Sequence, residues 1–93
     1  MPFLSGHENE FCWIEAAGKC ACIHTIKGSR IVHQTLEELE KELDPAVFAR
    51  VHESAIVRRD QVRRLRMMLG GNGIVEMKGG AEIPVSHQYF RGL

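Results

Sequence analysis

The sequence lacks the features of a membrane or secreted protein. Its 93 residues contain no apolar run close to the roughly 20 residues that a membrane-spanning helix needs. A charged N-terminal segment followed by a long apolar stretch, the pattern of a secretory signal peptide, is also missing. We therefore expect a cytoplasmic protein whose segment makes no membrane contact. The length suits one small domain with a single hydrophobic core.

Aromatic residues are scarce, at 6% of the chain. Proteins that bind single-stranded nucleic acid stack successive bases on several exposed aromatic rings, so the composition disfavours that class of protein. The single tryptophan, Trp13, is instead expected in the core or at an interface.

The three cysteines, Cys12, Cys20 and Cys22, are an odd number, and all lie in predicted strands. Cys20 and Cys22 are two residues apart, so on a strand they point to the same face, which is poor geometry for a disulfide between them. With His24 and His33 they could suggest a metal site, but a second cysteine pair at zinc-like spacing is missing. We expect free, half-buried thiols in a reducing compartment, with no metal and no cofactor.

The net charge is zero, which by itself argues against a nucleic-acid partner. The charges are nevertheless unevenly distributed. Residues 1–45 carry four basic side chains against eight acidic ones, and residues 46–93 carry eight basic side chains against four acidic ones. Five arginines lie between Arg58 and Arg66. This asymmetry predicts one basic face that could bind a polyanion.

Most of the chain has the pattern of short strands. Residues 1–10 are expected to be a lead-in or linker and residues 11–93 to be the domain. Alternating or apolar segments separated by turn residues predict a mainly β fold. The strands are expected at residues 11–16, 20–26, 30–34, 47–52, 55–57, 61–69, 74–77 and 82–85. An amphipathic helix remains an alternative over residues 61–69, and a short helical turn is expected within residues 86–93.

One segment has a helical period. The stretch from Thr35 to Glu38 has the pattern of a capping box, in which each of these two side chains bonds the backbone of the other residue. Apolar residues then recur at helical spacing, namely Leu36, Leu39 and Leu43. Pro45 ends the pattern, which predicts one short α-helix over residues 36–43. Its solvent-facing side is acidic, so we expect this helix to cover the core and not to enter a DNA groove.

The most specific motif is residues 48–57, Phe-Ala-Arg-Val-His-Glu-Ser-Ala-Ile-Val, followed by Arg58 and Arg59. It resembles the central signature of the LytTR family, the DNA-binding output domains of bacterial transcription regulators. That signature has an aromatic residue, Arg-Val-His-x-Ser, an apolar run and a polar residue. Residues 13–16, 35–39 and 83–86 agree in order and spacing. The resemblance implies small antiparallel sheets stacked in an elongated arrangement with one short helix.

The same resemblance implies a function. We expect sequence-specific binding of double-stranded DNA at direct repeats in promoters, with two copies pairing on tandem repeats and a sensor or receiver domain in the full-length protein. An alternative is a protein-interaction or dimerisation module that has this fold but has lost DNA reading. A DNA reader needs its arginines clustered on one surface beside His87, whereas a pairing module does not.

The resemblance also implies three contact points. The first is the first hairpin turn, where Lys19 could meet a phosphate. The second is Arg58, which stands where the family usually has Asn. Arginine favours guanine O6 and N7 or a phosphate, so the target sequence should be altered. The third is His87, which replaces a typical Arg. Lys19 and His87 could equally be solvated surface residues.

Four further residues are candidates for DNA contact. Arg59 could bind the backbone, Gln88 could bind adenine or the backbone, and Arg50 could have a surface role or bind a phosphate. Arg63 adds positive charge, but Arg64 and Arg66 have the opposite strand parity, so all three cannot face one partner.

His52 and Ser54 invite a comparison with catalytic dyads. The two side chains would point the same way on a strand, but the sequence places no acid and no oxyanion donors near them. We therefore expect structural roles for both and no enzymatic activity.

Overall fold

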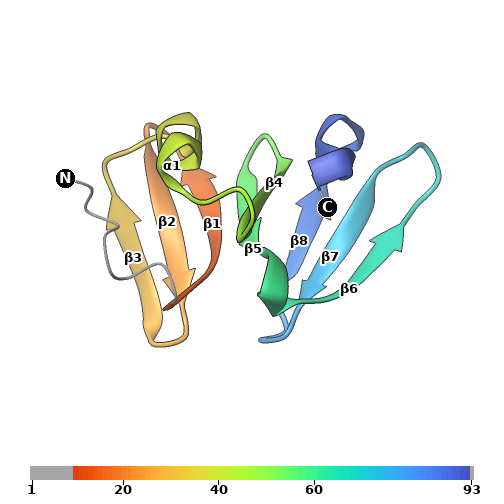
Figure 1. Ribbon diagram of the computed structural model, residues 1–93, viewed down its shortest axis with the longest axis horizontal. Helices are drawn as coiled ribbons and strands as arrows, with labels where there is room; N and C mark the ends of the chain where they lie inside the picture. The colour runs from red at the N-terminus through yellow and green to blue at the C-terminus, as the bar shows by residue number, and fades with distance from the viewer. Residues whose placement is uncertain (1–9, 93) are drawn as a thin grey trace.

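The computed structural model describes residues 10–92, and side chains for residues 10–89. Within this range the strands form two antiparallel sheets (Figure 1). The larger sheet has the strand order β3-β2-β1-β5-β4, and the smaller one β6-β7-β8. The strands are β1 (Phe11–Ala17), β2 (Cys20–Thr25), β3 (Gly28–Val32), β4 (Phe48–His52), β5 (Ala55–Arg58), β6 (Val62–Met67), β7 (Gly73–Met77) and β8 (Glu82–Val85).

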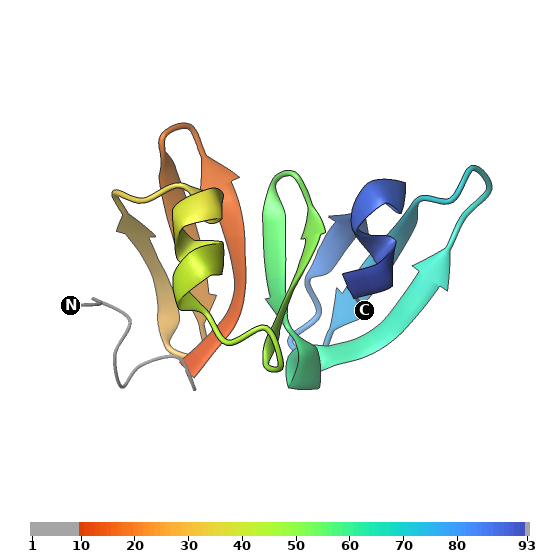
Figure 2. The same ribbon diagram turned by 45° about the horizontal axis from the view of Figure 1, so that its top comes forward.

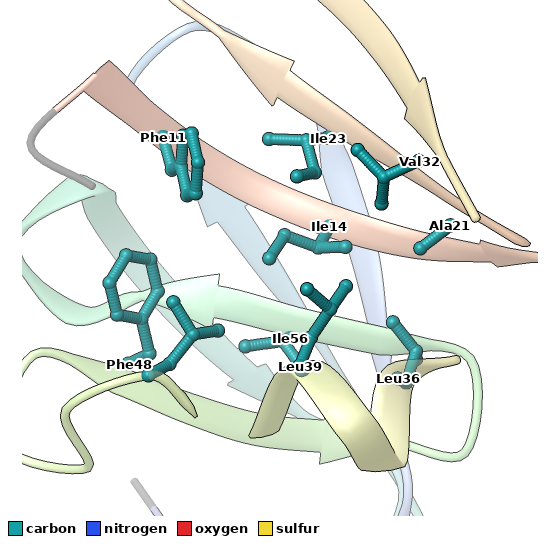
Figure 3. Close-up of a cluster of buried hydrophobic side chains, with 10 residues drawn as sticks. Phe11, Ile14, Ala21, Ile23, Val32, Leu36, Leu39, Phe48 and Ile56 are labelled. Carbon is teal, nitrogen blue, oxygen red and sulfur yellow. The ribbon is translucent and has the colours of Figure 1, made fainter. Parts of the chain in front are cut away.

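A helix covers one face of the larger sheet. Helix α1 (Leu36–Glu42) starts with the expected capping box, because the Thr35 side chain accepts from the Glu38 N–H and the Thr35 N–H donates to Glu38 Oε1 at 2.8 Å. Its leucines face strand residues whose side chains share one face, as Figure 3 shows. Buried members of this first core include Phe11, Ile14, Ala21, Ile23, Val32, Leu36, Leu39, Leu43, Phe48 and Ile56.

The opposite face of β4 and β5 packs against the smaller sheet. In the β1–β5 pairing, Ile14 stands opposite Ile56 and belongs to the first core, while Trp13 stands opposite Val57 on the other face. Val57 joins a second core between the sheets, against which Trp13 packs. The apolar run of β5 is therefore buried on both faces, as expected for a central strand. The second core also contains Ala49, Val51, Ala55, Val75, Met77, Ile83 and Val85.

This architecture confirms the predicted fold class. The fold is mainly β, and the molecule is elongated, with extents of 41 × 23 × 23 Å. Residues 62–67 form a strand, so the helical alternative for this segment is wrong. The predicted helical turn near the C-terminus is the 3-10 helix η3 (His87–Gly92). Residues 1–9, the larger part of the expected lead-in, lie outside the described residues.

Several boundaries differ from the predictions by one or two residues, and two of these differences have a clear local cause. The β2–β3 turn is formed by residues 26–27, so β3 already begins at Gly28, whose φ of 139° suits glycine. Helix α1 ends at Glu42, and Leu43 is its extended C-cap, whose side chain is still buried in the first core. Among the described residues, no helix is long and apolar enough to cross a membrane.

Candidate nucleic-acid interface

Several loops lie together along one edge of the molecule, seen at the top of Figure 2. The Ala16 N–H donates to the Ser54 carbonyl at 2.9 Å, which joins the β1–β2 and β4–β5 turns. The Ser86 N–H donates to the Val51 carbonyl at 2.8 Å, which places the start of η3 beside β4. We call this the tip edge. It comprises Gly18, Lys19, Glu53, Ser54, His87 and Gln88.

Arg58 lies at the other end of the sheet. It is the last residue of β5 and stands opposite Phe48 at the start of β4, so the whole length of the hairpin separates it from the tip edge. The following 3-10 helix, η2 (Arg59–Gln61), is joined to the β7–β8 turn because the Lys78 N–H donates to the Gln61 carbonyl at 2.8 Å. The structure therefore does not bring Arg58 together with Lys19 and His87, contrary to the expectation of one contact surface.

The residue at the β4–β5 turn that points to solvent is Glu53, which was not among the residues predicted from the sequence. His52 Nδ1 lies 2.9 Å from Ser54 Oγ and accepts from the Ser54 N–H at 3.1 Å. His52 and Ser54 therefore brace the turn itself, in the structural role expected for them, and Glu53 between them is exposed. The variable position x of the Arg-Val-His-x-Ser pattern could have indicated this residue. It lies between two side chains that form the turn, so its own side chain is left at the tip of the turn.

Lys19 and His87 are both exposed on the tip edge. Lys19 follows Gly18, whose φ of 66° closes the two-residue turn between β1 and β2. The His87 ring packs closely against Gly71 in the β6–β7 connection. A Cβ atom at residue 71 would lie only 2.5 Å from His87 Cδ2, so the contact requires glycine there. The His87 N–H donates to Asn72 Oδ1 at 3.2 Å, so this connection also fixes the backbone at the start of η3.

Arg50 is buried, so the expected surface role is wrong. Its side chain is 5% exposed. The Nε and Nη2 atoms donate to the carbonyls of His52 at 2.7 Å and Glu53 at 2.6 Å. The guanidinium also lies 5.2 Å from the centre of the Tyr89 ring in η3. Arg50 therefore supports the β4–β5 turn from beneath.

Helix α1 supplies the anions for this buried guanidinium. Arg50 Nη1 lies 2.9 Å from Glu40 Oε1, and Nη2 lies 3.1 Å from Glu37 Oε2. The pKa of Glu37 is lowered, first by a hydrogen bond from its own backbone N–H and then by the bond from Arg50. Arg50 thus connects α1, the β4–β5 turn and η3.

Among the described side chains, the arginines between Arg58 and Arg66 do not all lie beside His87. Arg58 Nε lies 2.8 Å from Asp60 Oδ1, and Arg59 Nη2 donates to the Pro45 carbonyl at 3.0 Å. Arg63 is exposed near the start of β6, the strand that follows Arg58 and η2. The five arginines of residues 58–66 are therefore spread from the end of β5 through η2 and along β6.

Two of these arginines are held by acidic side chains of the smaller sheet. Arg66 Nε lies 2.8 Å from Glu76 Oε2, and Arg64 Nε lies 3.8 Å from Glu76 Oε1. Arg64 and Arg66 therefore point to the same face of β6, as predicted. Arg59 and Gln88 both line a hollow of about 450 Å³ beside Arg50, so Gln88 borders this hollow as well as the tip edge.

The chain is similar to parts of known bacterial regulators. The chain is 41% identical over 87 residues to the CO-responsive transcriptional regulator RcoM of Rhodospirillum rubrum, covering 87% of this chain and 36% of that protein. It is 32% identical over 71 residues to the sensory transduction protein LytT of Bacillus anthracis, covering 76% and 29%. The chain thus spans about a third of the length of these relatives.

A solved structure has the same fold. It is the LytTr DNA-binding domain of a methyl-accepting/DNA response regulator from Bacillus cereus, with a TM-score of 0.83 and 23% identity, covering 89% of this chain and 76% of that one. The family model for the LytTr DNA-binding domain matches residues 9–93. The chain therefore belongs to the LytTR family of DNA-binding domains.

Proposed function

We propose that this chain binds double-stranded DNA sequence-specifically, as the output domain of a bacterial transcription regulator, and that the tip edge makes the contacts. The family membership supports the DNA-binding role. The bonds Ala16–Ser54 and Ser86–Val51, which align three loops along one edge, are the observation that supports this surface.

The dimensions suit such a role. The molecule is 41 Å long, and successive major-groove faces of a duplex are about 34–36 Å apart. An edge of this length could follow the duplex and place different turns in neighbouring groove segments. A mostly β reader of this kind would contact base edges with turn residues instead of a recognition helix.

The side chains of the tip edge offer complementary chemistry. Lys19 would bind a phosphate as a point charge, while His87 and Gln88 can each donate or accept a hydrogen bond. Glu53 would be repelled by phosphates, so in this proposal its carboxylate faces base edges, where it accepts from the cytosine N4 amino group. We propose Glu53 as a cytosine-reading residue.

Arg58, Arg59 and Arg63 have a more general role in this proposal. They lie away from the tip edge, so they would raise the local attraction for a polyanion without reading bases. We further propose that two copies bind adjacent direct repeats in promoter DNA in the cytoplasm, and that a sensor or receiver domain elsewhere in the full-length protein controls this binding.

Fluorescence anisotropy with a promoter fragment from upstream of the chain's own gene tests the proposal, with a scrambled duplex of equal length as control. Selective binding that weakens steeply as salt is raised is expected, because phosphate contacts release counterions. Equal and weak binding to both duplexes would contradict sequence-specific reading.

A second candidate function is pairing with another protein. Two observations favour it. Arg58 and Arg59 lie at the end of the sheet opposite His87. The end of β6 and the turn after it expose Met67, Met68 and Leu69, with Leu69 fully exposed. Light scattering after gel filtration separates the two functions. Stable dimers that form without DNA and bind no duplex would favour the pairing module.

A further inference from the structure

We propose that the open face of the β1–β2–β3 part of the larger sheet holds a binding site for a borderline-soft divalent transition ion such as Zn²⁺, with Glu15, Cys22 and His24 as ligands. This site is separate from the proposed DNA contacts. No metal was expected here from the sequence, because a second cysteine pair at zinc-like spacing is missing.

The register of the first hairpin brings the three side chains together. Glu15 stands directly opposite Cys22 in the β1–β2 pairing, and His24 lies two residues beyond Cys22 on the same face. The carboxylate oxygen, the thiol sulfur and the imidazole nitrogen all lie within 4.8 Å of one another. All three residues are half-buried, so an ion can reach them from solvent.

These atoms form a suitable donor set. Zinc prefers thiolate, imidazole and carboxylate ligands in a tetrahedron, with bonds of about 2.0–2.3 Å. Such bonds put neighbouring ligand atoms about 3.3–3.7 Å apart. His24 Nε2 is now 2.7 Å from Glu15 Oε1, so the ion would replace the hydrogen bond between them after a small opening. The fourth position would be taken by water.

One ligand is already held in position. The His24 ring stacks on Trp13, with ring centres 4.2 Å apart and an angle of 11° between the planes. Trp13 in turn packs against the second core. A histidine whose ring plane is fixed loses less freedom when it binds an ion, and groups that orient a ligand contribute to metal affinity.

The ion would act on the first hairpin. Glu15 is on β1, whereas Cys22 and His24 are on β2, so a bound ion would cross-link the two strands two residues from the turn that carries Lys19. We therefore expect metal binding to raise the thermal stability of the domain. It releases protons, since the thiol has to be deprotonated.

Titration of the reduced chain with Co²⁺ tests the site, because a cobalt–thiolate bond gives a charge-transfer absorption band. Trp13 is the single tryptophan and contacts His24, so the paramagnetic ion should also quench its fluorescence in a saturable manner. Added Zn²⁺ should reverse both signals. No saturable band and no quenching would overturn the proposal.

Variants locate the site. Cys22→Ser and His24→Gln should each lower the affinity for Co²⁺ by at least about 100-fold, since loss of even an outer partner costs 10–100-fold. Cys20→Ser is the matched control, because Cys20 lies on the same face but its Sγ contacts His33 Nδ1 at 3.4 Å. Thermal unfolding without metal confirms that each variant folds. A loss with Cys20→Ser equal to that with Cys22→Ser would overturn the assignment of the three ligands.

Discussion

The Arg50 guanidinium donates a 2.6 Å hydrogen bond to the Glu53 carbonyl and lies over the Tyr89 ring at 5.2 Å. One buried cation therefore joins the β4–β5 turn to η3, two of the three parts of the tip edge. Its countercharges, Glu37 and Glu40, come from α1. The helix thus contributes to the proposed interface through Arg50, although it does not itself lie on the tip edge.

Replacing Arg50 by Met should lower the free energy of unfolding by about 2 kcal/mol. Hydrogen bonds to charged groups contribute about 1.5–3 kcal/mol, and these are lost. The loss is partly offset because the variant no longer has to remove a guanidinium from water on folding. Urea denaturation measures the change. Arg50→Lys is the control: it keeps the charge but cannot make the forked contacts, so it should recover only part of the stability. Full recovery of stability by Arg50→Lys would contradict the role of the several hydrogen bonds made by the guanidinium.

Replacing Glu37 by Gln should lower the stability of the domain at neutral pH and have little effect on it in acid. The folded pKa of Glu37 lies below its ordinary value of 4.5, so its contribution is present above pH 4.5 and is lost as the pH falls through the lowered folded value. Urea midpoints of the wild type and the variant, measured from pH 7 to pH 3, should therefore converge. Midpoints that diverge as the pH falls would exclude this interaction.

Replacing Glu53 by Ala should relax the target sequence. If its carboxylate reads cytosine, substitution at the contacted base pair should cost the wild type about 1–3 kcal/mol and the variant much less. Competition binding with a set of single-base-pair changes measures this difference. An unchanged preference at every position would remove Glu53 from the contacts.

Replacing Lys19 by Ala should weaken binding to all duplexes and reduce the salt dependence by about one phosphate contact. Lys27→Ala, which changes the turn at the other end of β2, is the matched control and should leave the salt dependence unchanged. Equal effects of the two substitutions would show that only net charge matters.

The sequence determined much of the fold because local signals and the family pattern agree. The Thr35–Glu38 capping box and the leucine spacing gave the helix to within one residue. The alternation of apolar residues, together with the turn residues, indicated the strands. The family pattern supplied the arrangement of the sheets, which the alternation alone does not specify.

The site was predicted less well because it depends on which edge each residue occupies. Arg58 follows an apolar run and was placed with Lys19, but β5 runs back from the tip, so the residue that ends it lies at the opposite edge. Arg50 was read as a surface charge, since its partners Glu37 and Glu40 are 13 and 10 residues away in the chain. The cluster of Glu15 and Cys22 depends on the β1–β2 register, where a slip of one residue would put them on opposite faces.

The most direct test of the tip edge compares two double variants by anisotropy on the promoter fragment and its scrambled control. Lys19→Ala with His87→Ala changes the tip edge, and Arg58→Ala with Lys78→Ala changes the opposite edge. The first pair should lower specific affinity at least about tenfold, equivalent to about 1.4 kcal/mol, and reduce discrimination. The second pair should weaken binding to both duplexes by the same factor and leave the preference for the promoter fragment unchanged. The reverse pattern would contradict the proposal and assign DNA contact to the edge that carries Arg58.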